Sequence, residues 1–298
     1  MRQRLKPPRL PQVGLNLHDE DDFRQAAFPL FEADEVEILE YSFDSAWGPA
    51  GEPEWQCELV DFYASQGRLL GHGVTFSPLS GKWEQRQEHW LRRFAEELRR
   101  RSYLHVSEHF GFMSAGNFHD SAPLPVPRTA GALRVGRDRL RRLSEVAGVP
   151  VGLENLAFAF GPEDVRGQGG FLEDLLEPVN GFLLLDLHNI YCQVCNFKVD
   201  ADTLLDSYPL ARVCELHVSG GTWSQPGGEP FRRDTHNGPV PDEVFALLPM
   251  ALERCPNVRS VIYEWMGGTL PSEEHRTQFR NDFRKLKALV REACLGKR

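Results

Sequence analysis

Long apolar runs are missing from this chain of 298 residues. No stretch approaches the roughly 20 consecutive apolar residues that are needed to span a bilayer, so insertion into a membrane is not expected. The basic, proline-rich start MRQRLKPPRLPQ contains no apolar core of the kind that a secretory signal requires. We therefore expect a cytoplasmic protein in which residues 1–12 form an extended N-terminal arm.

An excess of positive charge is also missing. Lys and Arg number 34 against 43 Asp and Glu, and the formal net charge is −9. Because an acidic surface repels polyanions, this balance disfavours non-specific binding of nucleic acids. We expect no nucleic-acid partner.

The six cysteines are too scattered to form a disulfide framework. Cys192 and Cys195 stand alone as a C-x-x-C pair. Such a pair can be redox-active or supply half of a zinc site, but the second pair that a structural zinc site needs is absent. Free thiols without a catalytic task are the simpler interpretation.

Eight short runs rich in leucine and β-branched residues alternate with longer segments of helical period. Near-continuous apolar runs of this length are typical of strands that are buried on both faces of a parallel sheet. The predicted strands span residues 13–17, 36–41, 68–74, 103–109, 151–155, 181–187, 212–218 and 260–265.

The segments between the strands are amphipathic. Residues 84–101 are the clearest case, because Trp90, Phe94 and Leu98 recur four residues apart among Glu, Gln and Arg. Eight alternating β–α units in about 250 to 300 residues predict a closed (β/α)8 barrel, or TIM barrel. We expect this α/β fold as a single domain over residues 13–298.

Two longer segments between the units are rich in proline, glycine and polar residues. Residues 117–127 follow the fourth strand, and residues 219–240 follow the seventh. The active site of such a barrel lies at the C-terminal ends of the strands, where these segments meet. We expect both to border an active site.

Histidines and carboxylates stand at or just past the ends of most predicted strands. Imidazole and carboxylate bind borderline transition metals. A single histidine at a strand end is more often a capped or hydrogen-bonded residue, but burying so many ionisable groups without a metal would leave several charges uncompensated. The sequence therefore predicts a multinuclear metal centre. Its candidate ligands are His72, His109, Glu154, Asp186, Asn189, His217, Asp234, His236 and Glu264.

Glu154 is central to this prediction, because a carboxylate at the end of the fifth strand can bridge two cations across the barrel axis. One ion would be held by His72, His109 and Glu154. The neighbouring ion would share Glu154 and take three further strand-end residues, Asp186, His217 and Glu264. A third and weaker site, which includes an amide ligand, would be formed by Asn189, Asp234 and His236. We assign catalytic roles to Glu154, Asp186 and His217.

Other polar residues flank the candidate ligands. Since side chains alternate along a strand, Glu108 is expected to line the core or support the site from behind, and Asn155 is open to the same interpretation. His188 lies inside a run of candidate ligands and could be an additional ligand or a neighbour. Four histidines fit no such position and are expected to be surface or structural residues: His18, His89, His105 and His275.

Several segments of the chain resemble one known family: GHGV, VSEH, GLENLA, LLLDLHNIY, ELHVSGG and DTHNGPVPDEVFALL. The family is that of the multinuclear non-haem iron-dependent oxidative enzymes, formerly domain of unknown function 692 and typified by the methanobactin biosynthesis oxidase. The similarity extends over residues 13–268, and DLHNIY and DTHNGPVPDEV are its most specific parts. The fold that the resemblance implies is a (β/α)8 barrel, in agreement with the strand count.

The resemblance implies oxidation of cysteine residues in a ribosomally made precursor peptide. Two or three irons of mixed Fe(II)/Fe(III) valence would use dioxygen as co-substrate. Carried over by position, the paired irons would be held by His72, His109, Glu154, Asp186, His217 and Glu264, and the third iron by Asn189, Asp234 and His236. We also expect a separate peptide-recognition protein, because the short proline-rich arm is too small to form a domain of its own.

The chain departs from the family pattern in two places. His188 and Asn189 stand where the family commonly has two adjacent asparagines, and the first two strands keep only part of the usual pattern, including Glu40. The third metal site and the substrate are therefore where this chain should differ from the better-known members.

Three alternatives share this barrel and these ligand types. The set is similar to that of three-zinc apurinic endonucleases, but a surface that grips DNA needs Lys and Arg in its strand-end loops. It is more distantly similar to that of divalent-metal sugar isomerases, which would need a lysine or histidine acid/base beside the metals and no third metal site. A non-catalytic, metal-stabilised subunit is the third alternative, which the complete ligand set disfavours.

Overall fold

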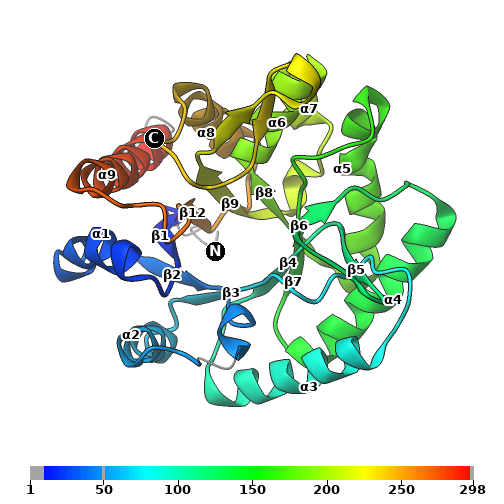
Figure 1. The fold of residues 1–298 in the computed structure, drawn as a ribbon, viewed down its shortest axis with the longest axis horizontal. Helices are drawn as coiled ribbons and strands as arrows, with labels where there is room; N and C mark the ends of the chain where they lie inside the picture. Colours follow the sequence, from blue (N-terminus) through cyan, green and yellow to red (C-terminus); the bar gives the residue numbers. More distant parts are fainter. Residues whose placement is uncertain (1–9, 49–50, 296–298) are drawn as a thin grey trace, which may run out of the picture.

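A closed barrel of parallel strands forms the centre of the molecule, in the order β1-β12-β9-β8-β7-β4-β3-β2. The computed structural model describes residues 10–48 and 51–295. Helices surround the barrel (Figure 1), so the predicted single-domain (β/α)8 fold is confirmed. The barrel strands are β1 (Gln12–Leu17), β2 (Ile38–Tyr41), β3 (Leu69–Gly73), β4 (Val106–His109), β7 (Val151–Glu154), β8 (Phe182–Asp186), β9 (Val213–Ser219) and β12 (Ser260–Glu264).

The helices lie outside the barrel and alternate with its strands. They are α1 (Asp21–Glu32), α2 (Glu54–Ser65), α3 (Gln85–Arg100), α4 (Ala130–Ala147), α5 (Pro162–Leu176), α6 (Leu187–Phe197), α7 (Ala201–Asp206), α8 (Asp242–Arg254) and α9 (Glu273–Leu295). Short 3₁₀ turns lie at Ser45–Trp47, Glu177–Val179, Leu210–Arg212 and Pro226–Gly228.

Helix α3 forms where the amphipathic period predicts a helix. Its start is fixed by a capping box: the Glu84 side chain accepts from the backbone N–H of Gln87, and the Gln87 side chain accepts from the backbone N–H of Glu84. Trp90 and Phe94 are buried against the barrel, and Leu98 packs at the edge of the same core. The apolar stripe of the helix thus covers the strands, as expected for a crossover helix.

Two short hairpins lie at the segments that are expected to be loops: the first begins before residues 117–127 and ends within them, and the second lies inside residues 219–240. Strands β5 (Phe112–Ala115) and β6 (Phe118–Leu124) pair antiparallel, and Gly116 provides the positive φ, +54°, of their tight turn. Strands β10 (Thr222–Ser224) and β11 (Phe231–Arg233) form the second hairpin within residues 219–240. Both follow the C-terminal ends of barrel strands, so both border the mouth of the barrel.

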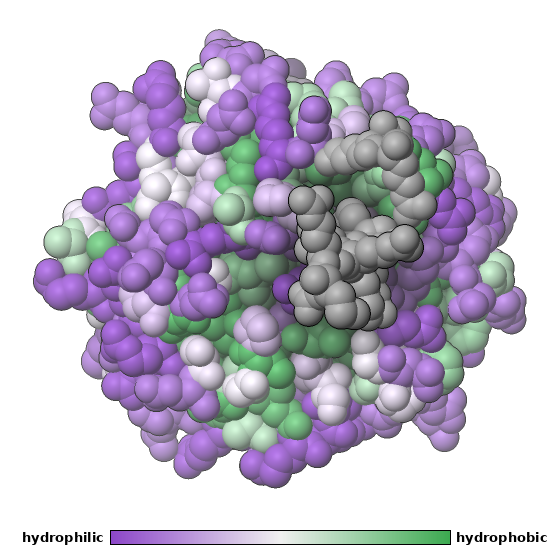
Figure 2. All heavy atoms as spheres, turned by 180° about the vertical axis from the view of Figure 1, so that it is seen from behind, coloured by the Kyte–Doolittle hydropathy of each residue, from purple (hydrophilic) through white to green (hydrophobic). Residues whose placement is uncertain are grey.

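The two ends of the described chain close the ring of helices. Helices α1 and α9 lie side by side (Figure 1), and Arg284 of α9 forms an ion pair of 2.8 Å with Glu35, just after α1. Inside, Tyr263 of β12 packs against Phe279 and Phe283 of α9. The face that points away from the viewer in Figure 1 is hydrophilic around its rim, and apolar residues gather closer to its centre (Figure 2).

Strand β1 begins at Gln12, one residue before the predicted start of the barrel domain. Most of the predicted arm, residues 1–9, lies outside the described residues. Among the helices of the described part, none combines the length and the apolar character needed to cross a bilayer.

Candidate metal centre

Strand register gathers the candidate ligands at the C-terminal mouth of the barrel. His109 of β4 is paired with Glu154 of β7, and Asp186 of β8 is paired with His217 of β9. Since paired residues of neighbouring strands point to the same side of the sheet, each pair shares the inner face. Four sets of potential ligand atoms result, the atoms of each set lying within 4.8 Å of one another, and they form three groups. The first group is His72–His109–Glu154. The second combines two sets that share His217, Glu154–Asp186–His217 and Glu40–His217–Glu264, and the third is Asp186–Asp234–His236.

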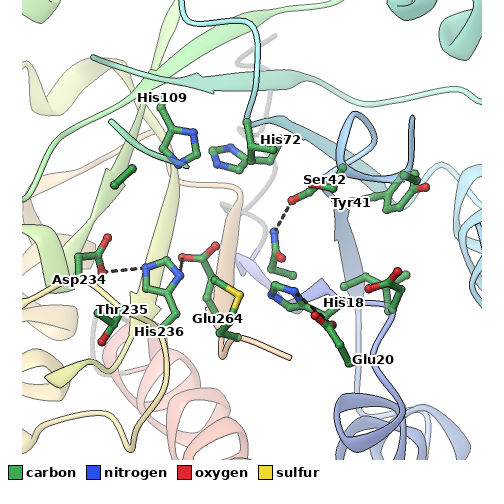
Figure 3. Close-up of a pocket in the computed structure, with 18 of the residues that line it drawn as sticks. His18, Glu20, Tyr41, Ser42, His72, His109, Asp234, Thr235, His236 and Glu264 are labelled. Carbon is green, nitrogen blue, oxygen red and sulfur yellow. Dashed lines mark hydrogen bonds and ion pairs between the residues drawn. The ribbon is translucent and has the colours of Figure 1, made fainter. Parts of the chain in front are cut away.

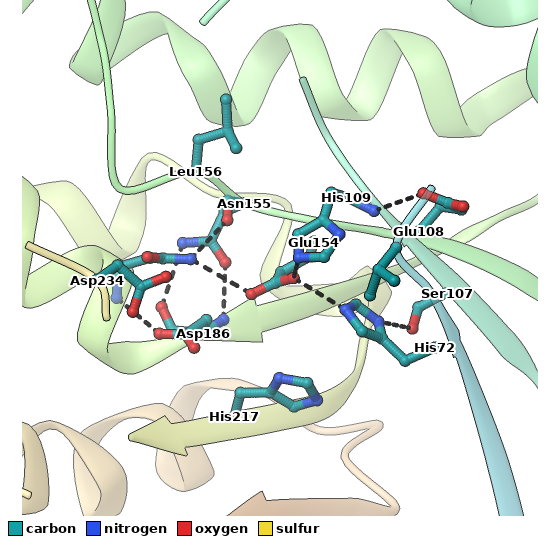
Figure 4. A network of polar contacts seen from close by, with 12 residues as sticks. His72, Ser107, Glu108, His109, Glu154, Asn155, Leu156, Asp186, His217 and Asp234 are labelled. Carbon is teal, nitrogen blue, oxygen red and sulfur yellow. Dashed lines mark hydrogen bonds and ion pairs between the residues drawn. The ribbon is translucent and has the colours of Figure 1, made fainter. Parts of the chain in front are cut away.

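The first group joins two imidazoles to one carboxylate. Nε2 of His72 lies 3.5 Å and Nε2 of His109 lies 3.3 Å from Oε2 of Glu154 (Figure 4). Nδ1 of His72 lies 2.8 Å from Oγ of Ser107, whose hydroxyl donates to the carbonyl of Gly71. The serine oxygen therefore accepts from Nδ1–H, which leaves the lone pair of His72 on Nε2, facing Glu154.

The second group lies between Glu154 and the opposite wall of the barrel. His217 is fully buried and stands between two carboxylates: its Nδ1 is 3.0 Å from Glu264 Oε2, and its Nε2 is 3.1 Å from Glu40 Oε2. Glu40 also accepts a hydrogen bond of 2.7 Å from Nδ2 of Asn16, its neighbour in the strand register. Glu40 is thus part of the site, a role that the sequence pattern does not assign to it.

Asp186 connects the second group with the third. It is the N-cap of α6: Oδ1 accepts a hydrogen bond of 2.6 Å from the backbone N–H of Asn189, and Oδ2 is left for the barrel mouth. Asn155 holds the backbone of Asp186 from both sides, accepting from its N–H at 2.7 Å and donating to its carbonyl at 3.2 Å. Nδ2 of Asn189 donates to Glu154 Oε1 at 3.3 Å.

The third group comes from the loop after the β10–β11 hairpin. Nε2 of His236 lies 2.7 Å from Oδ1 of Asp234, and Nδ1 lies 3.8 Å from Oε2 of Glu264 (Figure 3). His236 has a φ of +49°, which is unfavourable for a residue with a side chain. Strain of this kind persists where the surroundings impose it, and it is concentrated at functional sites.

The carboxylates of the site do not share one protonation state. Burial raises the pKa of Glu154 well above its usual range, and burial together with Asp234 raises the pKa of Asp186 to about 8. Burial disfavours charge on His217 as well, but Glu264 and Glu40 outweigh it and raise the pKa of that imidazole. Protons therefore occupy part of the site in the absence of a cation, and a bound cation would displace them.

Several polar atoms of the site are buried without a hydrogen-bond partner among the described residues. His109 Nδ1, Asp186 Oδ2 and Asn189 Oδ1 have none, while His217 Nδ1, Glu264 Oε2 and His236 Nε2 lie in close ionic contacts that lack the geometry of a hydrogen bond. Buried polar atoms are normally satisfied, so this concentration at one place indicates an absent partner. The nitrogen and oxygen donors, without thiolate, fit a transition metal such as iron, manganese or zinc.

A cavity of about 410 Å³ opens beside these groups. Five candidate ligands line it, and His18, Glu20 and Ser42 lie across from Asp234 and His236 (Figure 3). Pro123 of β6 adds a wall from the first hairpin. No lysine or arginine is among the described residues that line it. Its volume is large enough for a peptide side chain, and the candidate ligands in its wall are directly accessible from it.

His18 lines this cavity, although it is expected to be a surface or structural residue. Burial lowers its pKa to about 4, so the imidazole is neutral at physiological pH. Its position directly after β1 is the same strand-end signal that marks the other histidines. His105 is structural as predicted: it is buried against Glu215, with Nε2 and Oε2 2.7 Å apart. His89 and His275 are exposed.

Glu108 has the contacts of a supporting residue. It is fully buried, and its two carboxylate oxygens accept from the backbone N–H groups of Phe76 and His109, each at 3.2 Å. Burial and nearby Asp44 raise its pKa well above the usual range. Glu108 thus fixes the backbone of His109 and of the segment after β3.

The cysteine pair lies beside the third group without joining it. Cys192 and Cys195 are both free thiols on α6. Cys192 is buried, and burial raises its pKa well above that of an ordinary thiol. Because the thiolate is the reactive form, this burial disfavours Cys192 as a nucleophile.

Two solved structures illustrate the likeness of the fold. L-Ribulose 3-epimerase superimposes with a TM-score of 0.59 at 13% identity, covering 96% of this chain and 95% of that chain. The IOLI protein with a bound zinc atom superimposes with a TM-score of 0.61 at 12% identity, covering 94% and 98%. At these identities the likeness establishes the fold alone.

Two bacterial sequence relatives are named as UPF0276 proteins. A UPF0276 protein of Rhizobium meliloti (strain 1021) is 29% identical over 196 residues, 65% of this chain and 62% of that protein. A UPF0276 protein of Caulobacter vibrioides (strain NA1000 / CB15N) is 30% identical over 205 residues, 68% of this chain and 71% of that protein. The matched regions thus span roughly two thirds of each relative.

The family profile described as RiPP precursor modification enzyme MbnB/TglH/ChrH matches residues 19–286. RiPP denotes a ribosomally synthesised and post-translationally modified peptide. The match includes every candidate ligand, from His72 in β3 to Glu264 at the end of β12. The chain therefore belongs to this family of enzymes that modify RiPP precursors, as the sequence resemblance predicts.

Proposed function

We propose that this enzyme uses iron and dioxygen to oxidise cysteine residues of a ribosomally made precursor peptide. The observation that carries the proposal is the run of adjoining ligand groups that share Glu154 and Asp186 and contain buried polar atoms without a hydrogen-bond partner among the described residues. Shared carboxylates are how paired metal ions a few ångströms apart are held. A centre of this kind in a family that modifies RiPP precursors favours redox chemistry on the peptide.

We divide the ligands among three ions. His72, His109 and Glu154 would hold the first ion. The second would share Glu154 and be held by Asp186, His217 and Glu264, and the third would be held by Asn189, Asp234 and His236. Bound iron of mixed valence would bind the substrate thiolate and supply the one-electron chemistry that activates dioxygen.

The chain's own residues would prepare the site for this chemistry. Ser107 keeps the lone pair of His72 on Nε2, and Asn155 and the α6 cap hold Asp186. We assign catalytic roles to Glu154, Asp186 and His217, whose side chains are fully or nearly fully buried. Burial there excludes water from the reacting atoms, which strengthens electrostatic interactions with the substrate.

The substrate cysteine would enter through the cavity beside His18 and Ser42. A separate recognition protein would deliver the peptide, docking near the two hairpins. Phe118 on β6 and Trp223 on β10 support this placement, because both are large apolar side chains exposed next to the mouth.

Metal analysis of anaerobically purified protein, produced with ample iron, tests the proposal. We expect two or three irons per chain, with a mixed-valence signature in the Mössbauer spectrum, because a shared carboxylate requires a second ion. Stoichiometric zinc with activity, and no activity with iron, would overturn the assignment of iron.

The alternatives on the same barrel give different products. If the protein alone cleaves abasic DNA or interconverts sugars, while no cysteine-containing peptide changes mass in its presence under oxygen, the oxidative function should be abandoned. The cavity disfavours the first, because none of the described residues that line it is a lysine or arginine that could grip DNA. His18 lines the cavity as well, so the products alone separate the sugar alternative from the oxidative function.

A further inference from the structure

A buried arginine on the second hairpin is bonded to a histidine that none of the ligand groups uses. Arg232 of β11 is 5% exposed, and its Nε and Nη2 lie 3.1 and 3.0 Å from Nε2 of His188. His188, fully buried on the first turn of α6, places its Nδ1 2.9 Å from Oδ1 of Asp234. The three side chains form one hydrogen-bonded line that ends at a candidate ligand.

The chemistry of the guanidinium gives this line a direction. Arginine has only N–H donors, so Nε2 of His188 has to accept with its lone pair. In a neutral imidazole the other nitrogen then carries the proton, and Nδ1–H donates to Asp234. Both ring nitrogens of His188 are engaged in this arrangement, and neither has a lone pair left for a metal ion.

Arg232 is held in place by α6 and by its own hairpin. Oδ1 of Asn196 accepts from the backbone N–H of Arg232 at 2.7 Å, and Nδ2 of Asn196 donates to its carbonyl at 2.9 Å. The guanidinium carbon lies 5.4 Å from the ring centre of Tyr191 and 5.7 Å from that of Trp223. Cation–π contacts on two rings keep the donor pointed at His188.

The backbone beside His188 is also adapted to this arrangement. A Cβ atom added at Gly221 would lie 2.7 Å from Cε1 of His188 and 2.2 Å from the carbonyl oxygen of Arg233. Only a residue without a side chain leaves room for the imidazole and the hairpin together. The glycine at position 221 therefore makes the space that the His188 ring occupies.

We propose that Arg232 and His188 are positioning residues of the third metal site. His188 holds the Asp234 carboxylate through Nδ1–H, and Arg232 fixes that tautomer and keeps His188 out of the metal's ligand set. The inference rests on the proposed multinuclear function. Partners of this kind orient metal ligands, and their loss typically lowers metal affinity about 10- to 100-fold.

Titration of the metal-free protein with Co²⁺, followed by calorimetry, tests this assignment without peptide or oxygen. We expect Arg232→Met to weaken the weakest of three binding steps about 10- to 100-fold and to leave the tighter steps unchanged. Arg232→Lys, which keeps one donor, should lose less. Arg233→Met is the matched control, because Arg233 lies on the same strand with an exposed side chain that donates to Ser224.

Nitrogen NMR of the metal-free wild-type protein reads the tautomer directly and needs no variant. We expect the His188 proton on Nδ1, with Nε2 unprotonated, and a mixture of tautomers in Arg232→Met. A proton on Nε2 in the wild type would overturn the inference, as would unchanged Co²⁺ binding by Arg232→Met.

The two proposals fail in different ways. A wild-type chain that binds only two ions at saturating Co²⁺ would overturn the positioning role and leave the paired-metal function standing. The converse outcome combines the expected Co²⁺ and NMR results with an iron-loaded enzyme that oxidises no cysteine-containing peptide. It would support the positioning role and overturn the proposed function.

Discussion

Asp186 and Asn189 are joined by a hydrogen bond of 2.6 Å from the backbone N–H of Asn189 to Oδ1 of Asp186. This bond caps α6 and so determines which carboxylate oxygen is left for the barrel mouth. Oδ2 is buried and has no partner among the described residues. One side chain thus begins a helix with one oxygen and presents the other to Glu154 and His217.

Two substitutions at Asp186 separate these tasks. Asp186→Asn keeps a side chain that caps helices well, so the metal-free protein should remain as stable as the wild type, while metal content and turnover fall. Asp186→Ala removes the cap as well and should lose about 0.5–2 kcal/mol of unfolding free energy. Denaturant unfolding of the metal-free proteins and elemental analysis give the two readouts. Full metal content and rate in Asp186→Asn would contradict the assignment of Oδ2.

Glu154→Gln should remove at least one metal ion and all turnover, because an amide cannot bridge two cations as a carboxylate does. Glu145→Gln on the exposed face of α4 is the control and should leave both unchanged. Metal content per chain and peptide mass are the measurements. A Glu154→Gln protein with near-normal metal content and rate would show that the bridge is wrongly assigned.

Ser107→Ala tests the orientation of His72. Without the hydroxyl that accepts from Nδ1–H, His72 can carry its proton on either nitrogen, and metal affinity at its site should fall about 10- to 100-fold. Ser260→Ala is the control, because Ser260 is another fully buried strand serine, at the opposite end of the barrel. Equal metal affinities for both variants, measured by competition with a chelator, would remove the role of Ser107.

The candidate ligands of the first group are predictable from the sequence for a physical reason. Strands buried on both faces are near-continuous apolar runs, so His72, His109 and Glu154 are visible as polar residues at their ends. Parallel strands of a barrel end at one mouth, and this topology is enough to place the residues together before any contact is known. The hairpins are missed because their strands are short and lack a clear apolar alternation.

Other parts of the site depend on contacts that no local pattern encodes. Glu40 meets His217 only once the barrel closes, across 177 positions of sequence. From the sequence, Arg232 is expected to be one of two adjacent surface arginines on a polar loop. Only the packing of α6 against the hairpin shows that its side chain is buried. His18 carries the strand-end signal, but its role as cavity wall depends on which loops surround it.

A pH dependence of stability is expected away from the mouth, at Glu52. Burial opposes its ionisation, but hydrogen bonds from Arg101 and Tyr41 outweigh burial and lower its pKa to about 2. Because this folded-state pKa lies below that of an unfolded glutamate, about 4.5, the stabilisation is present above pH 4.5 and is lost as the pH falls toward 2.

Denaturant unfolding at several pH values measures this contribution. Between about pH 6 and pH 3, metal-free wild-type protein should lose more unfolding free energy than Glu52→Gln, whose side chain does not titrate. Glu54→Gln, two residues further along the chain and exposed, should behave as the wild type does. Parallel pH profiles for the wild type and Glu52→Gln would contradict the ion pair's contribution.

The most direct test of the central claim is the mass of a peptide. Iron-loaded enzyme is combined without oxygen with a candidate precursor peptide and a candidate for the proposed recognition protein, both chosen from neighbouring reading frames. Oxygen is then admitted, and the peptide is measured by mass spectrometry. We predict a change of mass located at a cysteine residue that requires iron, oxygen and Glu154 together. An unchanged peptide with fully iron-loaded wild-type enzyme, or a change that proceeds equally well without oxygen, would contradict the account.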